Sequence, residues 1–400
     1  MLTTPLKEKN KQVATVLAFA LIPMSGFATD VYLPSLPTMA QTLGVSELAV
    51  QLTLGMFLIS YGVSQLFVGS LLDSFGRYRI NLISLAIFAI ASIIIANTAN
   101  IYLIYAMRIV HGTTVGAIVV SKRAYFVDVY SGEKLKNYLS MFSIIWATAP
   151  IIAPFVGGYL QSFFGWQSNF YFLAAFAVVI LVLELIFSGE TIKQRMVFSF
   201  KKIAGVYVDM ISTASFTLGM VMLGLSYSMV MVYNMTGPFI IEHRLGLSPI
   251  VAGYSSLVLG TAVMVGGLFG KATINSPFVK KLTINMVLQL GFCLAMFGSL
   301  FFVENLYSMI FFAFCIHATS GYTFNTFFTF CLTRFPKNAG IAGGLTGGIN
   351  YVIVSFLSYG IIAVIPAKDE LNLAYSYAVL IALSILALFV IFKNYSKNMK

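Results

Sequence analysis

The sequence predicts an all-α membrane protein with twelve transmembrane helices arranged in two six-helix bundles. The first observation is composition, because 59% of the 400 residues are hydrophobic, 9% are charged and the mean hydropathy is +0.91. Such a chain has too little polar surface to cover a soluble fold. The second is that apolar runs long enough to cross about 30 Å of hydrocarbon recur along the chain. The third is a polar joint near the middle, with six runs on either side.

Each apolar run is predicted to be a helix, since the runs are too long for barrel strands and lack the alternation of apolar and polar residues typical of them. The first run has no small-residue cleavage site, so we expect a retained span rather than a signal peptide. The twelve predicted spans cover residues 13–36, 47–72, 78–97, 101–127, 135–161, 166–188, 211–240, 248–271, 282–303, 305–332, 339–366 and 371–393.

The longest joint, residues 189–210, separates the two predicted bundles, residues 1–188 and residues 211–400. It mixes apolar side chains with Lys201 and Lys202. This composition suits either a helix that lies on an anionic cytoplasmic leaflet or a flexible linker.

Glycine-rich helix faces indicate that the second bundle repeats the first. Glycines recur in the second and eighth spans, and in the fifth and eleventh, about half a chain apart in both cases. Small residues let helices approach closely in lipid, and parallel six-span repeats are one transporter plan. Glycine is frequent in membrane helices in general, but two span pairs that share one offset favour duplication. The glycines are Gly55, Gly62 and Gly69 with Gly253, Gly260 and Gly267, and Gly157 and Gly158 with Gly343, Gly344, Gly347 and Gly348.

Basic residues predict the orientation of the chain. Of the 24 Lys and Arg residues, 21, including Lys122, fall in the joints on one side of the predicted membrane or at the termini, and two, Arg244 and Lys368, fall on the other. The positive-inside rule makes the basic side cytoplasmic, so both termini are predicted to be cytoplasmic. The net charge of +11 is thus spread over short joints and offers no solvated basic face to a nucleic acid.

Three ionisable residues, Asp30, Arg108 and Glu184, lie inside predicted spans, where an unpaired charge is costly and a functional role is the first hypothesis. Asp30 and Arg108 each lie about seven residues from the outer end of their span, and a rise of 1.5 Å per residue places both about 10 Å below the outer surface. Glu184 lies near the cytoplasmic end of the sixth span, where we expect its side chain to reach the interface.

Opposite charges at matching depth admit two interpretations of Asp30 and Arg108. They could form a structural ion pair that joins two helices, or Asp30 could be a titrating carboxylate in a cavity, tuned by the fixed charge of Arg108. We favour the second, because intramembrane carboxylates commonly mark proton or substrate routes. The hydroxyls of Thr29 and Tyr32 are expected beside Asp30. His111, one turn beyond Arg108, is either a second proton site or a neutral core histidine.

Four segments of the first half resemble motifs of the major facilitator superfamily. GSLLDSFGRYR (residues 69–79) is similar to the loop between its second and third spans, and RIVHG (residues 108–112) to its fourth-span motif. APIIAPFVGG (residues 149–158) is similar to the fifth-span motif of its antiporters. DVYLPSLP (residues 30–37) resembles the drug:proton antiporters of the bicyclomycin and chloramphenicol resistance type. The resemblance implies the major facilitator fold over the whole chain.

The loop motif has a physical explanation beside the resemblance. Asp73 ends the second span and Arg77 begins the third, so a carboxylate meets a guanidinium across a tight turn that Gly76 permits, with Gly69 one turn earlier. Such a latch could hold one arrangement of the cytoplasmic gate. Ser74 and Tyr78 stand where the family usually has basic residues, and His111 stands where it usually has Gln.

The fifth-span motif predicts a kinked helix with a smooth surface. Pro150 and Pro154 each remove a helical hydrogen bond, and Gly157 and Gly158 permit close packing. Such a helix suits sliding between inward-open and outward-open states.

The resemblance implies proton-coupled antiport that exports small amphipathic drugs or metabolites by alternating access, in the inner membrane of a bacterium. We expect no cofactor and no metal, only the proton gradient as energy source, with a small-molecule substrate, the proton and the bilayer as partners of a monomer. The residues expected at the substrate cavity are Thr29, Tyr32, Tyr61, Trp146, Tyr233, Asn234 and Asn325.

Three other functions are alternatives to drug export. A dedicated siderophore or metabolite transporter of the same fold, working in either direction, is the nearest. An enzyme is not expected, because no H-E-x-x-H, Asp-rich or Ser-His constellation occurs at membrane depth. A passive channel would have no evident use for a buried charge pair.

Overall fold

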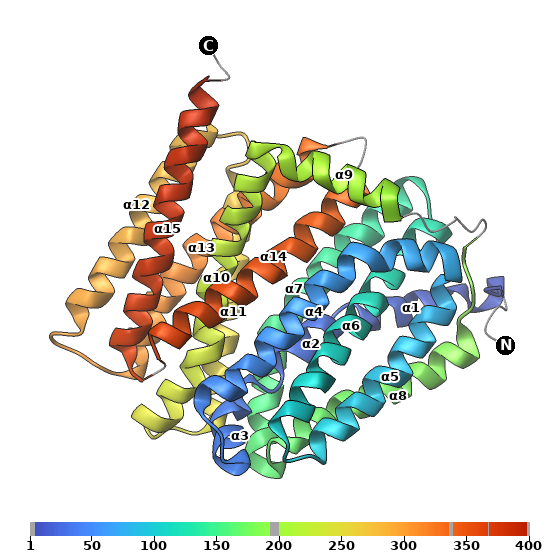
Figure 1. Ribbon diagram of the computed structural model, residues 1–400, viewed down its shortest axis with the longest axis horizontal. Coiled ribbons are helices and arrows are strands. Elements are labelled where there is room, and N and C mark those ends of the chain that lie inside the picture. Colours follow the sequence, from blue (N-terminus) through green and yellow to red (C-terminus); the bar gives the residue numbers. More distant parts are fainter. Residues whose placement is uncertain (1–4, 193–199, 336–338, 367, 398–400) are drawn as a thin grey trace. The chain divides into compact units, whose positions relative to one another are not determined.

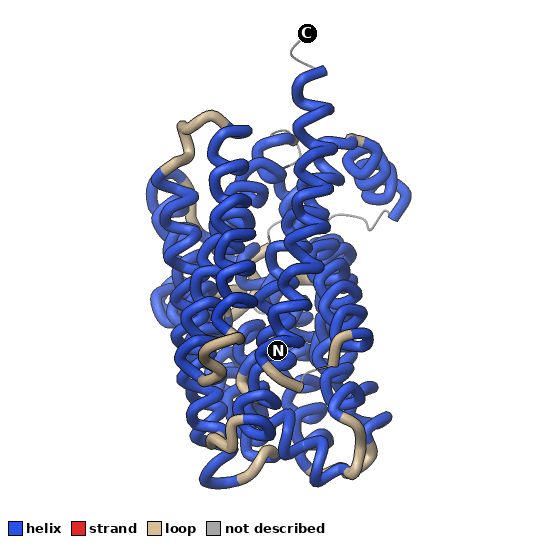
Figure 2. Tube along the Cα trace, turned by 90° about the vertical axis from the view of Figure 1, so that its left-hand side faces the viewer, coloured by secondary structure: helices blue, strands red, loops and turns tan. Residues whose placement is uncertain are grey.

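The computed structural model describes residues 5–192, 200–335, 339–366 and 368–397. All the regular elements in these ranges are helices (Figure 2). The chain divides into two compact units, Met1–Lys202 and Ile203–Lys400.

In the first unit, the first predicted span is not one helix, which corrects the prediction of a single run. Pro23 lies between its first two helices, and Pro34 lies in the 3-10 turn that follows Asp30. Proline lacks the N–H that a continuous helix requires and restricts the residue before it. A short 3-10 turn, η1 (Glu8–Asn10), precedes the span, whose parts are α1 (Lys11–Leu21), α2 (Met24–Asp30), η2 (Leu33–Ser35) and α3 (Leu36–Leu43).

The other five spans of the first unit are single helices (Figure 1). They are α4 (Glu47–Phe75), α5 (Arg77–Ala96), α6 (Ile101–Val129), α7 (Gly132–Phe164) and α8 (Gln167–Phe187). Pro150 and Pro154 lie inside α7, which is assigned as helix through both prolines.

The second unit contains the remaining six spans. Helix α9 (Phe200–Ser212) precedes them and lies where the sequence allows an interfacial helix. The spans are α10 (Ala214–Phe239), which continues into the π-helical turn η3 (Ile240–Arg244), then α11 (Pro249–Ala272), α12 (Phe278–Ser299), α13 (Leu306–Arg334), α14 (Ala339–Val364) and α15 (Glu370–Lys397).

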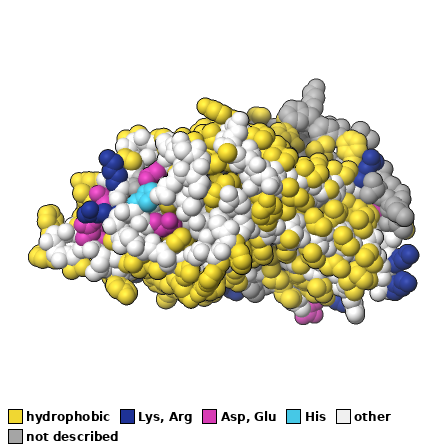
Figure 3. All heavy atoms as spheres, turned by 90° about the horizontal axis from the view of Figure 1, so that it is seen from below, with side chains coloured by type: hydrophobic (Ala, Val, Ile, Leu, Met, Phe, Trp, Pro, Cys, Tyr) yellow, Lys and Arg dark blue, Asp and Glu magenta, His cyan; other side chains and the backbone are white. Residues whose placement is uncertain are grey.

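These helices confirm the predicted twelve-span fold. Ten segments of the described chain are long and apolar enough to cross a membrane, and α7 and α13, with 33 and 29 residues, supply the fifth and tenth spans. Large apolar side chains such as Ile90, Val179 and Leu294 are exposed on the helices. Figure 3 shows hydrophobic atoms over much of one face, with charged side chains in a few places. This is the surface of a multi-pass membrane protein.

Each unit contains a corresponding pair of closely packed helices, and this correspondence supports internal duplication. Helices α4 and α6 pack together in the first unit, as α11 and α13 do in the second. Helix α6 begins after Asn100 and α13 after Asn305, and each Asn caps its helix. Gly116 and Gly321 lie 16 residues beyond these caps. A Cβ at Gly116 would lie 2.0 Å from Ser64 Oγ, and one at Gly321 would lie 2.4 Å from a backbone oxygen of α11.

Two of the glycines predicted to permit this contact, Gly69 and Gly267, do not do so. A Cβ at Gly69 would have no atom within 4 Å, and one at Gly267 would only touch Asn325 at 4.0 Å. Close contacts occur at Gly112 and Gly116 of α6, Gly266 of α11 and Gly321 of α13.

Candidate functional site

Arg108 is fully buried in the first unit and joins three helices. From α6, its Nη1 donates to Ala28 O at 2.9 Å in the last turn of α2, and its Nε donates to Thr53 O at 3.3 Å in α4. The guanidinium carbon lies 4.6 Å from the ring centre of Tyr32 and 4.4 Å from that of Phe57. Carbonyls at a helix C-terminus and aromatic faces both stabilise a cation. The charge of Arg108 is therefore held by neutral groups.

His111 continues this hydrogen-bonded cluster on α6. Its Nδ1 lies 3.4 Å from Arg108 Nη1, and its Nε2 lies 3.0 Å from Ser92 Oγ on α5. Since guanidinium nitrogens can only donate, Nδ1 accepts and Nε2 carries the proton that is donated to Ser92. Ser92 in turn donates to Phe88 O at 2.9 Å, and the Phe88 ring stacks on the imidazole with ring centres 4.3 Å apart. This geometry fits a neutral imidazole.

Asp30 is buried at the end of α2, where the first span is interrupted. Its Oδ1 has no hydrogen-bond partner in the described part of the chain. Arg108 acts on the carboxyl electrostatically, but the two side chains form no direct ion pair among the described residues, so a structural ion pair is not what the geometry shows. The expected hydroxyl partners are also occupied elsewhere. Thr29 donates to Ser25 O at 2.6 Å, and Tyr32 hydrogen-bonds Thr53 at 3.0 Å.

The other residues expected at the cavity fall into separate groups. Tyr61 is buried in α4, with its ring stacked on Phe57 at 5.7 Å. The side chain of Trp146 lies outside the described residues. In the second unit, Tyr233 and Asn234 lie on α10, whereas Asn325 lies on α13 beside α11.

His317, a histidine that the sequence analysis does not single out, lies beside Tyr233. His317 Nε2 is 3.0 Å from Tyr377 Oη, and the rings of Tyr233 and Tyr377 pack edge-on against its imidazole. Its position inside an apolar span is the signal that could have identified it from the sequence, because ionisable residues at membrane depth are functional candidates.

The fifth-span motif packs against the interrupted first span. A Cβ at Gly157 of α7 would lie 1.6 Å from Val31 O, next to Asp30. A Cβ at Gly26 of α2 would lie 2.5 Å from Ala149 Cβ, beside Pro150. Pro154 and Gly158 are buried in the same helix. The motif thus allows α7 to touch the backbone on both sides of the functional carboxylate candidate.

We expect Gly157→Ala to destabilise the protein. The added methyl group overlaps Val31 O, so α7 must shift, and overpacking of this kind typically costs about 1–3 kcal/mol. Gly69→Ala is the matched control, because a Cβ there meets open space. Thermal unfolding in detergent micelles checks the difference, and equal midpoints for the two variants would show that the contact is not tight in solution.

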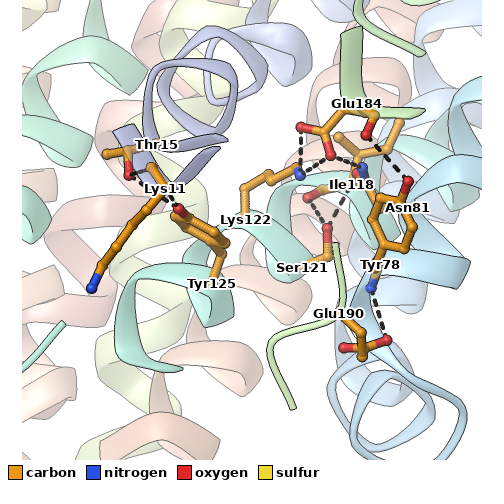
Figure 4. Close-up of polar contacts among 10 residues, drawn as sticks. All are labelled: Lys11, Thr15, Tyr78, Asn81, Ile118, Ser121, Lys122, Tyr125, Glu184 and Glu190. Atoms are coloured by element: carbon orange, nitrogen blue, oxygen red, sulfur yellow. Dashed lines mark hydrogen bonds and ion pairs between the residues drawn. The ribbon is translucent and has the colours of Figure 1, made fainter. Parts of the chain in front are cut away.

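Glu184 does not reach the interface, which corrects the prediction made from its position. Its side chain is 0% exposed and accepts from Lys122 Nζ at 2.7 and 2.8 Å (Figure 4). Asn81 Nδ2 donates to the same carboxylate at 3.3 Å, and Ser121 Oγ donates to Asn81 Oδ1 at 3.3 Å. Lys122 is likewise no joint residue: it lies inside α6 with its side chain 7% exposed. A second charged cluster, missed from the sequence, therefore joins α5, α6 and α8.

The loop between α4 and α5 contains the latch that its residues suggest. Gly76 has φ +98°, and Arg77 Nη2 lies 3.0 Å from Asp73 Oδ1. Arg77 also pairs with Asp128 of α6 and donates to Ala124 O at 2.8 Å. Asp128 is an acidic partner that the sequence interpretation did not include.

Glu190 ties the segment after α8 to the same loop. Its carboxylate accepts from the backbone N–H groups of Arg77 at 3.1 Å and Tyr78 at 3.3 Å, which are the first residues of α5. A carboxylate at a helix N-terminus satisfies donors that lack helical partners. The backbone of Glu190 also accepts from Leu6 N at 3.1 Å. The first residues of the predicted joint 189–210 thus contact the first unit.

Among the described residues, no group of three His, Cys, Asp or Glu side chains is placed to bind a metal ion.

Comparison with known proteins agrees with this architecture. The sequence profile described as Major Facilitator Superfamily matches residues 18–359. Multidrug resistance protein MdtL of Shewanella oneidensis is 27% identical over 343 residues, covering 82% of this chain and 83% of that protein. Multidrug resistance protein D of Escherichia coli is 24% identical over 357 residues, covering 86% and 87%. The Bicyclomycin resistance protein homolog of Haemophilus influenzae is 24% identical over 404 residues, covering 98% and 99%.

A solved structure shows the same fold. The crystal structure of a D-xylose–proton symporter matches with a TM-score of 0.70 at 15% sequence identity, over 95% of this chain and 97% of that chain.

Proposed function

Because the chain belongs to the major facilitator superfamily of transporters, we propose that it exports small amphipathic molecules in exchange for protons. The export direction and the substrate class are supported by relatives named for multidrug and bicyclomycin resistance. We place both termini in the cytoplasm on the distribution of the basic residues, and the protein in the inner membrane of a bacterium on its family and bacterial relatives. We further propose that it works as a monomer. The proton gradient would be its only energy source.

The observation that carries the coupling proposal is the buried carboxyl of Asp30. An ionised oxygen that is buried without a hydrogen-bond donor is costly, so the arrangement described here suits the protonated acid. Arg108 is already satisfied by neutral acceptors and aromatic rings. Among the residues that the structure describes, Arg108 has no other carboxylate as a partner. When Asp30 is ionised, Arg108 can therefore attract it without first breaking another ion pair.

The coupling follows from this difference between the two protonation states. Ionised Asp30 is attracted to Arg108 and to a cationic or polar group of the substrate, whereas the neutral acid is not. Protonation from the outside would release the substrate there, and inward opening, deprotonation and reloading would complete the cycle. Val31 and Gly26 contact α7, so movement of the Asp30 segment is transmitted to the helix with the antiporter-like motif.

The test uses everted membrane vesicles that contain the protein, with a pH gradient imposed across the membrane. We expect an inside-acidic gradient to drive uptake of lipophilic cations or neutral antibiotics, and each transported compound to dissipate part of the gradient. Siderophores are included in the panel because they are the nearest alternative. Accumulation of a compound that does not depend on the gradient, or uptake of siderophores alone, would contradict the proposal.

A further inference from the structure

The second unit contains a groove of about 590 Å³ between α11, α12 and α13, apart from the residues of the proposed transport site. Its walls are mainly apolar and include Phe269, Ile284, Leu288 and Phe314. Phe269, Ile284 and Leu288 are exposed, as are neighbouring apolar residues of the same helices. The groove therefore opens onto the surface that lipid covers.

Close packing of α11 on α13 creates this groove. A Cβ at Gly266 would lie 1.8 Å from Ala318 O, which fixes these two helices in contact. Helix α12 follows a short turn and packs against α13 and α15. Both α11 and α12 thus rest on α13, and the space between them is left unfilled.

The polar groups on the groove floor already have partners. Asn285 Nδ2 donates to Thr319 O at 3.0 Å and to Thr323 Oγ1 at 2.9 Å. The hydroxyls of Thr273 and Tyr322 hydrogen-bond each other at 2.7 Å. A polar solute that enters the groove would lose its hydrogen bonds to water and find few free groups to replace them. A hydrocarbon chain needs no hydrogen bonds.

Two lysines at one end of the groove lack acidic partners. Lys281 Nζ donates to Thr273 O at 3.3 Å and to Ile274 O at 3.4 Å, which holds the ammonium group at the end of α11. Lys280 is exposed beside it. No carboxylate of the described residues forms an ion pair with either, in contrast to Arg77 and Lys122 of the first unit.

The acidic residues of the second unit explain this imbalance. Between residues 203 and 400 there are five: Asp209, Glu242, Glu304, Asp369 and Glu370. All except Asp209 lie at the opposite ends of the helices: Glu242 in η3, Glu304 between α12 and α13, Asp369 between α14 and α15, and Glu370 at the start of α15. The lysine end of the groove therefore has a net positive charge.

We infer that this groove binds an anionic phospholipid of the cytoplasmic leaflet, with its phosphate at Lys280 and Lys281 and an acyl chain between α11 and α12. The positive charge at one end of the groove matches the phosphate of such a lipid, and the apolar walls match its acyl chain. The positive-inside rule places this end in the cytoplasm, where the leaflet surface is anionic. None of its lining residues belongs to the proposed transport site.

The experiment places a tryptophan reporter in the groove and quenches it with brominated lipids. The sequence has two tryptophans, Trp146 and Trp166, which are first replaced with Phe. Leu288→Trp then reports on the groove, and Val287→Trp is the control, because Leu288 lines the groove and is 50% exposed whereas Val287 lies outside its lining and is 64% exposed. Each variant is reconstituted in mixtures of neutral lipid with brominated phosphatidylglycerol or brominated phosphatidylcholine.

We expect Leu288→Trp to be quenched at a mole fraction of phosphatidylglycerol about thirtyfold lower than that of phosphatidylcholine, the preference that about 1 kcal/mol for each of the two lysines near an anionic surface implies. Lys280→Gln with Lys281→Gln should abolish this preference, and Lys271→Gln with Lys393→Gln, which removes the same charge outside the groove lining, should retain it. Val287→Trp should show no preference.

Mass spectrometry of the intact, natively folded wild type in a mixture of both lipids gives a second measurement that needs no reporter. We expect bound phosphatidylglycerol in the wild type and in the Lys271, Lys393 control, but not in the Lys280, Lys281 variant. Equal quenching by both lipids, or adducts that persist in the Lys280, Lys281 variant, would overturn the inference. So would protection of Leu288→Trp by a transported solute in place of the lipid.

Discussion

Asp30→Asn abolishes proton-driven transport while the protein still folds. An amide has nearly the shape of a carboxylic acid but cannot take up a proton, so we expect gradient-driven uptake in everted vesicles to fall by about tenfold or more. Because Oδ1 of Asp30 has no partner in the described chain, the change breaks no hydrogen bond of that atom. Exchange of labelled for unlabelled substrate without a gradient does not require proton transfer, so it should persist at substrate concentrations high enough to offset the weaker binding to a neutral side chain.

Two controls accompany this variant. Asp30→Glu keeps a carboxyl group and should retain part of the coupled flux. Glu133→Gln removes an exposed carboxylate from the first turn of α7 and should leave the flux unchanged. Full gradient-driven transport by Asp30→Asn would show that another group carries the proton.

Lys122→Met destabilises the first unit strongly. The substitution leaves the Glu184 carboxylate, which is 0% exposed, without its cationic partner. Breaking a buried ion pair on one side costs about 3–5 kcal/mol, whereas replacing both partners with apolar residues of similar size is often neutral or stabilising. We therefore expect Lys122→Met to lower the thermal midpoint in detergent micelles and Lys122→Met with Glu184→Met to recover most of the loss.

Arg244→Met is the matched control for this pair of variants. It breaks the ion pair between Arg244 and Glu304, whose side chains are 56% and 40% exposed. Exposed pairs contribute about 0–1 kcal/mol, so its effect should be small. A loss in the double variant equal to that in Lys122→Met would mean that packing, not the unpaired charge, causes the instability.

The sequence predicts the twelve spans because membrane helices have a strong and local signal. An apolar stretch of about 20 residues needs no partner to be identified. The interruption of the first span was not predicted, although Pro23 and Pro34 are visible in it. Proline is tolerated in many membrane helices and α7 passes through two of them, so the residue type alone does not decide where a helix breaks.

The Lys122–Glu184 pair could have been predicted by the argument applied to Asp30 and Arg108. Lys122 lies five residues before the end of the predicted span 101–127, and Glu184 lies four residues before the end of the predicted span 166–188. Both are at similar depth with opposite charge. In the sequence analysis, Lys122 is assigned to a joint, where the positive-inside rule explains any basic residue. Lys122 was therefore not considered as a charge inside a span.

Contacts between distant segments carried no comparable signal. Glu190 caps α5, more than a hundred residues earlier in the chain, and no periodicity or spacing connects the two. The same holds for the partners of Arg108, which are backbone oxygens and ring faces rather than the carboxylate that its charge suggested. Backbone carbonyls occur at every residue, so the sequence cannot indicate which of them an arginine will bind.

The central claim is that Asp30 exchanges its proton for substrate, and proton release on substrate binding tests it most directly. Purified protein in a weakly buffered detergent solution is mixed with a transported compound while a pH-sensitive dye is monitored. We expect the wild type to release protons on binding, and Asp30→Asn, whose neutral amide resembles the protonated acid, to bind the compound more weakly and to release no protons at concentrations that saturate it. Equal release by both proteins, or substrate binding by the wild type without release, would contradict the account.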